Sequence, residues 1–308
     1  MENNEKKMDT IDTLLLSGGA MKCLSILGSM KYLFERNIIK ENFEGIKDIF
    51  FVSGASFYVT PLLLGYSIDS TLEIFKRINY SKNFDIMDTL KLSNLIQNYG
   101  FKSITEYHYT MESIIKEKGY RTDITLLDLY NIIPINVHFK VINITEDRIE
   151  YLNKDNSPNL KLIDAISMTC CIPILFEPLE YKGNKYIDGG VICNFPYEKC
   201  KGPHYIGINI ITTRSSLSQF EYNNQERKKI EINSFGEYLL FLFDIYGGVP
   251  AIDNSINHIK IIITGTGIEY KKLEKKIKET IMIGYNQTKQ HFSNFQLHTD
   301  SNPHEKEN

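Results

Sequence analysis

The sequence predicts an α/β fold, a three-layer α/β/α sandwich around a mainly parallel central sheet, with a site at the carboxyl ends of the strands. Short apolar runs of strand length alternate with longer stretches of helical periodicity. A glycine-rich loop follows the first apolar run, a corner of small residues follows the second, and an Asp-Gly-Gly turn follows a late one. We therefore expect the functional residues in these connections.

Length and composition indicate a globular protein of a reducing compartment. The chain has 308 residues, of which 42% are hydrophobic and 24% charged, and its net charge of −3 gives no field that would attract nucleic acid. The cysteines are odd in number and lack a C-x-x-C pair, so they predict neither disulfides nor a zinc site and favour a cytoplasmic location. The polar start and the lack of an apolar run of about 20 residues predict no signal peptide and no membrane span.

We expect a single domain over residues 11–298, with a disordered start at 1–10 and a disordered polar tail at 299–308. A helical insertion is predicted at about residues 69–133. Its helical patterns cover residues 71–78, 85–98, 103–118 and 125–132. Residues 234–246 are rich in aromatic residues and leucine, which suits a core helix, with a membrane-facing or lid helix as the alternative.

The first strand is predicted at residues 13–16 and leads into the loop Ser17-Gly18-Gly19-Ala20, after which a helix runs to about Arg36. Such a loop at a helix start exposes backbone N–H groups that can hold an anion, and Lys22 adds positive potential. An ordinary tight turn is the alternative, because neither nucleotide-binding glycine pattern is complete.

The second strand is predicted at residues 49–52 and ends in a tight corner of small residues before a helix. A strand–turn–helix corner of this kind is typical of a nucleophile elbow. Gly54-Ala55-Ser56 matches the first half of the G-x-S-x-G pattern, so Ser56 is the predicted nucleophile. A serine that caps a buried helix is the alternative, and Pro61 is expected in the first turns of that helix.

Later strands are predicted at residues 137–145, 148–152, 204–211 and 259–264, and helices at 160–171 and 271–292. His138 in the first of these strands suits a packed, hydrogen-bonded residue better than a catalytic one. Asp188 ends a short strand and is followed by Gly189 and Gly190. A carboxylate there can face a neighbouring strand end, whereas a simple Asp-Gly turn is the alternative.

Together and in this order, these segments resemble the patatin-like phospholipases over nearly the whole chain. The segment from Ser17 to Cys23 is similar to that family's G-G-G-x-[RK]-G loop, and Gly54-Ala55-Ser56 looks like its nucleophile motif. Asp188-Gly189-Gly190, with Asn194 and Pro196 beyond, looks like its aspartate motif.

The resemblance implies a Ser56–Asp188 dyad that acts on ester bonds of lipids without a histidine, a metal or a cofactor. It also implies an oxyanion hole around Gly18, Gly19, Ala20 and Lys22. Because an unperturbed aspartate is a weak base, we expect Ser56 and Asp188 within hydrogen-bond distance in a partly desolvated site.

Three residues depart from the family's glycines: Tyr58 in the elbow, Cys23 at the end of the loop, and Ala20, which is the mildest change. A phospholipase A-type hydrolase that contacts membrane surfaces transiently is the leading hypothesis. One alternative is a catalytically impaired relative that serves as a lipid-binding or interaction module. The other is a thioesterase or soluble esterase. No protein partner is indicated.

Overall fold

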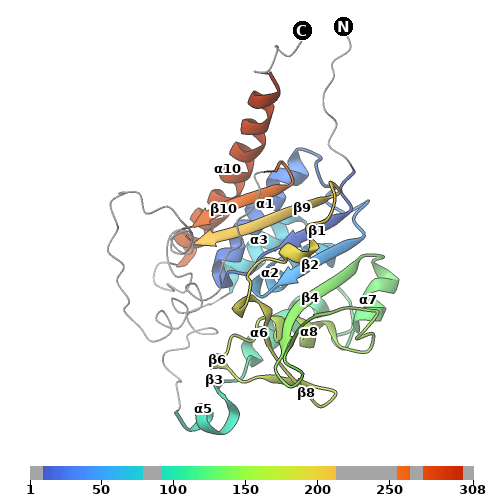
Figure 1. The fold of residues 1–308 in the computed structure, drawn as a ribbon, viewed down its shortest axis with the longest axis vertical. Helices are drawn as coiled ribbons and strands as arrows, with labels where there is room; N and C mark the ends of the chain where they lie inside the picture. The colour runs from blue at the N-terminus through green and yellow to red at the C-terminus, as the bar shows by residue number, and fades with distance from the viewer. Residues whose placement is uncertain (1–9, 79–91, 213–254, 264–272, 301–308) are drawn as a thin grey trace, which may run out of the picture.

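The computed structural model describes residues 10–78, 92–212, 255–263 and 273–300 (Figure 1). The strands are β1 (Thr13–Leu16), β2 (Asp48–Val52), β3 (Gly100–Lys102), β4 (Asn136–Asn143), β5 (Arg148–Leu152), β6 (Ile174–Phe176), β7 (Leu179–Tyr181), β8 (Asn184–Asp188), β9 (Tyr205–Thr212) and β10 (His258–Ile263). The α-helices are α1 (Leu24–Glu35), α2 (Gly54–Leu63), α3 (Ile68–Arg77), α5 (Leu92–Asn98), α6 (Thr105–Glu117), α7 (Leu126–Ile132), α8 (Leu162–Thr169) and α10 (Leu273–Asp300). Short 3-10 helices are η1 (Ala20–Cys23), η3 (Gly189–Val191) and η4 (Tyr197–Lys199). The helix predicted at residues 234–246 lies outside the described ranges, as do residues 1–9 and 301–308 of the predicted disordered ends. Residues 299–300 of the predicted tail belong to α10.

The main sheet has eight strands in the order β10-β9-β1-β2-β4-β8-β7, with β5 also paired to β4. Strands β10, β9, β1, β2 and β4 are mutually parallel, whereas β5 and β8 run antiparallel to β4. The chain leaves β1 toward β2 on one side and returns through β9 on the other. The strand order therefore reverses at β1, and α/β folds place their sites at the carboxyl ends of the strands beside such a topological switch point.

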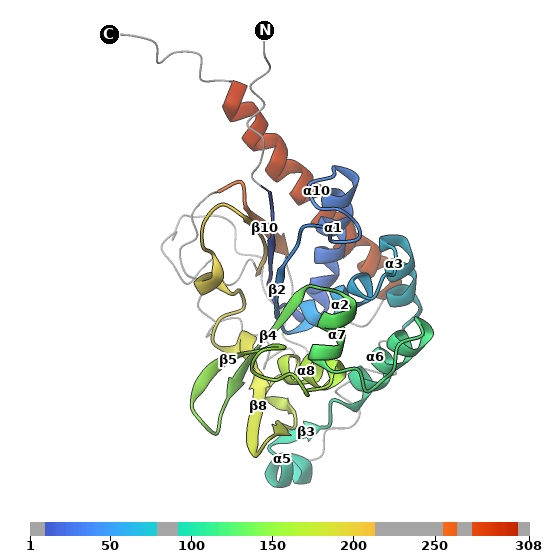
Figure 2. The same cartoon turned by 90° about the vertical axis from the view of Figure 1, so that its right-hand side faces the viewer.

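Figure 2 shows α1, α2, α3 and α10 on one side of the sheet, while the chain that follows β8 passes over the opposite side. The α/β fold with a mainly parallel sheet flanked by helices is thus confirmed. A small second sheet, β3 paired in parallel with β6, lies partly within the predicted helical insertion and was not predicted. None of the helices in the described ranges is long and apolar enough to span a lipid bilayer.

The helix after β2 begins earlier than the sequence indicated. Helix α2 starts at Gly54, directly after the corner, so the expectation that Pro61 falls in its first turns is wrong. Pro61 lies in the second half of the helix, where it gives the preceding turn no N–H donor. Because α2 starts at Gly54, the corner between β2 and α2 is formed by Ser53 and not by Ser56.

Helices α1 and α10 cross in close contact through two glycines. A Cβ atom on Gly28 would lie 1.9 Å from the carbonyl oxygen of Ile281, and one on Gly284 would lie 1.9 Å from that of Ser25. Each backbone thus occupies the space that a side chain would take on the other helix.

Gly284→Val is therefore expected to lower the free energy of unfolding by about 3 kcal/mol, because the two helices must separate to admit the side chain. Asn286→Ala, at an exposed position two residues further along α10, is the matched control and is expected to change it by less than about 0.5 kcal/mol. Urea unfolding of both variants measures the difference, and equal stabilities would show that the crossing adapts.

Candidate active site

The strand register brings the ends of β2 and β8 together across β4. Val52, the last residue of β2, pairs with Lys140 of β4, and the next residue, Val141, pairs with Asp188 at the end of β8. The residue that follows Val52 is Ser53. The first residue of the corner and the aspartate therefore meet over the middle of β4.

Ser53 and Asp188 are joined by a short hydrogen bond. Ser53 Oγ donates to Asp188 Oδ2 at 2.5 Å, and the backbone N–H of Gly190 donates to Asp188 Oδ1 at 2.7 Å. Ser53 is 6% exposed and Asp188 3% exposed, so the bond lies in a desolvated environment. A proton can pass directly between the two side chains in this geometry.

Ser53 has the backbone conformation of an elbow. Its φ of 52° and ψ of −133° lie outside the regions that a residue with a side chain prefers, between the last residue of β2 and the first of α2. Such a strained strand-to-helix residue points its side chain above the end of the strand.

The predicted pairing of Ser56 with Asp188 is wrong. Ser56 is fully buried inside the first turn of α2, where its Oγ donates to the carbonyl oxygen of Ser53 at 2.8 Å and lies 3.6 Å from Cys170 Sγ. The described hydrogen bonds to the Asp188 carboxylate come from Ser53 and Gly190 instead. Because α2 starts at Gly54, the residue two positions later points into the helix packing rather than toward the strand end.

Thr169, at the end of α8, holds the corner in place and was not predicted. Its Oγ1 accepts a hydrogen bond from the Ser53 N–H at 3.0 Å and donates to the carbonyl oxygen of Lys140 at 2.6 Å. Thr169 is fully buried, so the bridge fixes the elbow to β4. The sequence offered one signal, a polar residue within a run of small and apolar ones.

The predicted oxyanion loop follows β1 and is clamped by Asn194. The Gly18 N–H donates to the Asn194 carbonyl oxygen at 2.9 Å, and Asn194 Nδ2 donates to the Gly18 carbonyl oxygen at 2.8 Å. The Gly18 N–H is therefore engaged and does not fit the predicted role of oxyanion donor. Within the described part of the chain, no hydrogen bond uses the N–H groups of Gly19 and Ala20, which have φ values of 155° and 49°.

Two glycines allow the loop to touch the elbow. A Cβ atom on Gly54 would lie 2.9 Å from the Ala20 carbonyl oxygen, and one on Gly18 would lie 3.0 Å from Ser53 Cβ. Lys22, which was predicted to add positive potential, is buried and donates to Thr212 Oγ1 at 2.8 Å, which ties the loop to the end of β9.

Gly189 and Gly190 carry the turn after Asp188. A Cβ atom on Gly189 would lie 2.5 Å from the Lys140 carbonyl oxygen, and one on Gly190 would lie 3.0 Å from Asp188 Oδ1. The lack of side chains at these positions lets the turn fold back onto β4. It also lets the Gly190 N–H reach the carboxylate that it binds.

Burial brings the pKa of the Asp188 carboxyl close to neutral pH. Desolvation raises its pKa to about 7, against the lowering effects of the hydrogen bonds from Ser53 and Gly190 and of the Lys140 charge. The Lys140 side chain is buried beside this turn, where its Nζ donates to the Cys193 carbonyl oxygen at 3.0 Å and lies 3.8 Å from Glu198 Oε1. An aspartate with a pKa near 7 is a far better proton acceptor than an exposed one.

The three replacements of family glycines differ in conformational cost, and not in the order that the sequence indicated. Tyr58 lies inside α2 with its ring 4.7 Å from that of Phe75, away from the corner that Ser53 occupies. Cys23 has a φ of −61°, which any residue adopts, whereas Ala20 is in the left-handed region with a φ of 49°. The conformational cost therefore falls on Ala20, which the sequence marked as the mildest change.

The buried thiols beside the site are poor competitors for the serine. Burial raises the pKa of the Cys23 and Cys170 thiols, and the nearby Asp188 carboxylate raises the pKa of both as well. A thiol must ionise before it acts as a nucleophile or a metal ligand. Within the described ranges, no group of three or more histidine, cysteine, aspartate or glutamate residues is arranged to hold a metal ion.

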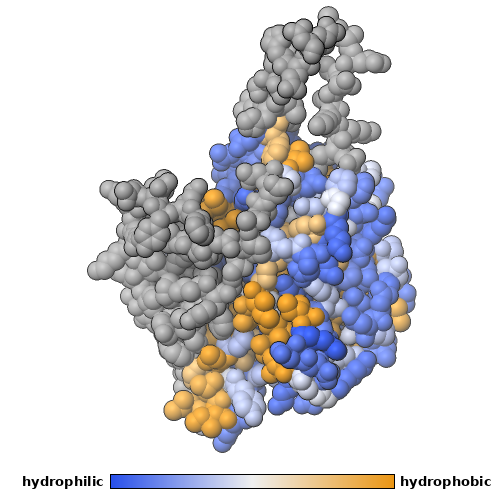
Figure 3. All heavy atoms as spheres, viewed as in Figure 1, coloured by the Kyte–Doolittle hydropathy of each residue, from blue (hydrophilic) through white to orange (hydrophobic). Residues whose placement is uncertain are grey.

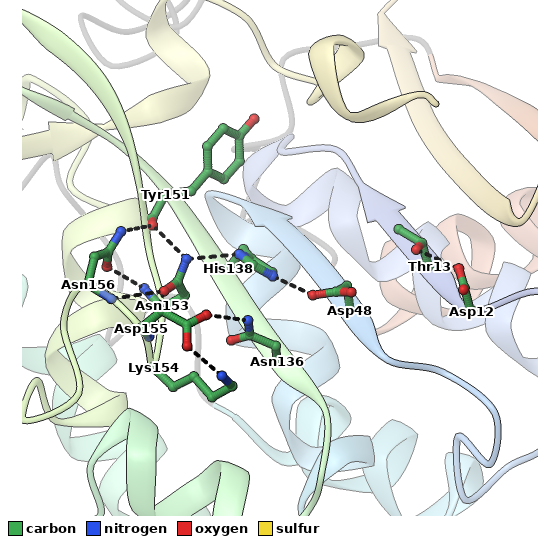
Figure 4. Close-up of polar contacts among 10 residues, drawn as sticks. All are labelled: Asp12, Thr13, Asp48, Asn136, His138, Tyr151, Asn153, Lys154, Asp155 and Asn156. Atoms are coloured by element: carbon green, nitrogen blue, oxygen red, sulfur yellow. Dashed lines mark hydrogen bonds and ion pairs between the residues drawn. The ribbon is translucent and has the colours of Figure 1, made fainter. Parts of the chain in front are cut away.

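His138 is a packed, hydrogen-bonded residue, as predicted. Its Nε2 lies 2.7 Å from Asp48 Oδ1 and its Nδ1 lies 3.1 Å from Asn153 Nδ2, as Figure 4 shows. The ring stacks on Phe50 at 4.1 Å. Because Asp48 begins β2 and Ser53 follows its end, this cluster lies at the opposite edge of the sheet from the dyad.

We predict that Asn194→Ala lowers kcat for the ester hydrolysis that the family resemblance implies about 10²-fold, because the loop of Gly18, Gly19 and Ala20 loses the side-chain half of its clamp. KM is expected to change far less, since the side chain bonds the loop backbone. Asn209→Ala is the matched control, because this buried amide donates to Tyr197 Oη at 2.9 Å and not to the loop. Steady-state kinetics of the two variants test the prediction, and an equal loss in both would indicate a general packing effect.

The chain is similar to known families and proteins. The family model described as "Patatin-like phospholipase" matches residues 14–200. The "Uncharacterized protein R571" of Acanthamoeba polyphaga mimivirus is 28% identical over 205 residues, which cover 64% of each chain. The "Probable lipid hydrolase 463L" of Invertebrate iridescent virus 6 is 29% identical over 196 residues, which cover 60% of this chain and 62% of that protein. The matches thus span somewhat less than two thirds of these viral relatives.

Among solved structures, VipD from Legionella pneumophila is similar with a TM-score of 0.55 at 17% identity, over 93% of this chain and 67% of that one. At this identity the likeness concerns the fold. The family match includes the loop after β1, the corner after β2 and the turn after β8. The chain therefore belongs to the patatin-like phospholipase family.

Proposed function

We propose that the protein is a phospholipase A-type acyl hydrolase in which Ser53 is the nucleophile and Asp188 the general base. The hydrogen bond between Ser53 Oγ and Asp188 Oδ2 carries this proposal. The family match and the viral relative named as a probable lipid hydrolase support a lipid ester as the substrate.

In the first half of the reaction, Ser53 Oγ attacks the ester carbonyl carbon while its proton passes to Asp188. The carbonyl oxygen becomes an oxyanion that the N–H groups of Gly19 and Ala20 stabilise, assisted by the start of η1. Collapse of this intermediate breaks the bond between the acyl carbon and the alcohol oxygen. Asp188 returns its proton to the leaving lysophospholipid, and the acyl group remains on Ser53.

In the second half, a water molecule attacks the acyl-Ser53 ester, and Asp188 accepts a proton from that water. The same N–H groups stabilise the second oxyanion. When the intermediate collapses, Ser53 Oγ regains the proton from Asp188 and the free fatty acid departs. One water molecule is consumed for each ester bond, and the site returns to its starting protonation state.

Labelling with a fluorophosphonate probe followed by peptide mass spectrometry tests the nucleophile. We expect the adduct on Ser53, and Asp188→Asn is expected to slow its formation because the serine loses its base. Release of fatty acid from phospholipid vesicles, measured against short soluble esters and thioesters, tests the substrate class. An unlabelled, folded protein would favour the alternative of a catalytically silent lipid-binding module.

A further inference from the structure

We propose that an exposed apolar surface on α5 and β6 is where the protein docks on a phospholipid bilayer. This surface, which we call the docking surface, is formed by Leu92, Ile96, Tyr99 and Ile174. The inference rests on the proposed function, because it assigns the place where the enzyme meets the membrane that holds its substrate.

Helix α5 turns apolar side chains to solvent. Leu92 is 65% exposed and Ile96 71%, and their spacing of four residues places them on one face of the helix. Tyr99, which is 63% exposed, follows the end of the helix with a φ of 63°. The helix Leu92–Asn98 contains no charged residue and no buried one. A short helix that exposes its apolar stripe in this way has a cost in water that contact with lipid would remove.

The helix is fixed to the body of the protein through β3 and β6. Asn98 Nδ2 donates to Glu177 Oε1 at 2.9 Å, and Gly100 pairs with Ile174. A Cβ atom on Gly100 would lie 2.3 Å from the Glu177 nitrogen, so the two backbones are in contact. Figure 3 shows apolar residues gathered at the end of the molecule where α5, β3 and β6 lie.

Ile174 extends the surface toward the active site. It is 36% exposed and has a φ of 70°, a conformation that β-branched residues rarely adopt. The segment that leads to it begins at Cys171, whose carbonyl oxygen accepts a hydrogen bond from the Asp188 N–H at 3.0 Å. Docking through this surface would therefore bring the bilayer to the part of the molecule that carries the dyad.

The side chains around the stripe suit a lipid interface better than a protein one. Lys185, in β8, has its Nζ 5.1 Å from the centre of the Tyr99 ring, and Lys182 is exposed in the turn between β7 and β8. A tyrosine with adjacent lysines beside exposed aliphatic residues is the pattern of a membrane interface, where the rings and ammonium groups lie at the headgroup level. The two lysines favour anionic headgroups, which predicts that binding weakens as salt is added.

Co-sedimentation with vesicles tests the inference. The full chain carrying Ser53→Ala is mixed with phosphatidylcholine vesicles, with and without phosphatidylserine, so that binding is measured without turnover. Ile96→Asp, and independently Leu92→Asp, is expected to lower the bound fraction at least about tenfold, because a charge replaces an aliphatic side chain that would enter the lipid. Ile132→Asp is the matched control, since this isoleucine is 53% exposed at the end of α7 and should bind as the parent does.

Hydrolysis of a short soluble ester, measured with the same substitutions in the otherwise wild-type chain, separates this inference from the proposed function. Ile96→Asp is expected to leave that activity unchanged and to reduce fatty acid release from vesicles. Vesicle binding that Ile96→Asp and Leu92→Asp do not weaken would overturn the inference even if the enzyme is active. A wild-type dimer that Ile96→Asp converts to a monomer would also overturn it, because a second copy would then be the occupant.

Discussion

Ser53→Ala is expected to lower kcat/KM for ester hydrolysis by at least about 10⁴-fold, whereas Ser56→Ala should retain activity within about tenfold. The reason is the partner of each hydroxyl. Ser53 Oγ donates to Asp188, while Ser56 Oγ donates to a backbone carbonyl oxygen inside α2. Steady-state hydrolysis of a short soluble ester by the two variants measures the difference.

Ser56→Ala is the matched control because both serines are buried and only three positions apart. It removes one hydrogen bond to the Ser53 carbonyl oxygen, which is expected to cost about 1 kcal/mol of unfolding free energy. Urea unfolding of both variants separates this effect from catalysis. An inactive Ser56→Ala beside an active Ser53→Ala would contradict the assignment and would require the site to rearrange when substrate binds.

The choice between the two serines shows where sequence reasoning failed. The end of β2 at Val52 was predicted correctly, and the residue of an elbow that points above the sheet is the first one after its strand. The pattern G-x-S was nevertheless matched from Gly54, because that frame supplies a glycine, while the frame centred on Ser53 has Phe51 and Ala55 at the glycine positions. Geometry at the strand end was therefore a better guide than the motif.

The parallel strands were predictable because each is a short apolar run closed by turn residues. The register of β8 against β4 was not predictable, since it depends on long-range pairing that no local pattern encodes. That register places Asp188 opposite Val141 and hence beside Ser53. The supporting contacts of Thr169, Asn194 and Lys140 depend on the same tertiary arrangement. Asn194 lies in the family's aspartate motif, but no local pattern predicts that it contacts the loop after β1.

We expect kcat/KM for ester hydrolysis to rise with pH and to level off above a midpoint near 7. Only ionised Asp188 can accept the Ser53 proton, and desolvation raises the pKa of this carboxyl to about 7. Asp188→Asn, which cannot accept the proton, is expected to lower kcat/KM by about 10⁴-fold above the midpoint. A pH–rate profile of the wild type that stays flat down to about pH 5 would contradict a base of this pKa.

Lys140→Met is expected to move this midpoint upward, because the buried Lys140 charge lowers the pKa of Asp188 and its removal favours the protonated carboxyl. Lys201→Met, which removes an exposed charge, is the matched control and should leave the midpoint in place. An unchanged midpoint in Lys140→Met would show that the ammonium group does not act on the base.

Stability gives an independent measure of the same carboxyl. Its folded pKa of about 7 exceeds the ordinary value of 3.8, so its protonated form stabilises the fold fully below about pH 4, and this stabilisation is lost as pH rises through about 7. The unfolding free energy of the wild type relative to Asp188→Asn should therefore fall across that interval, by at most about 1.4 kcal/mol per pH unit. Urea unfolding over a series of pH values measures this difference, and a constant difference would mean that Asp188 ionises equally in the folded and unfolded chains.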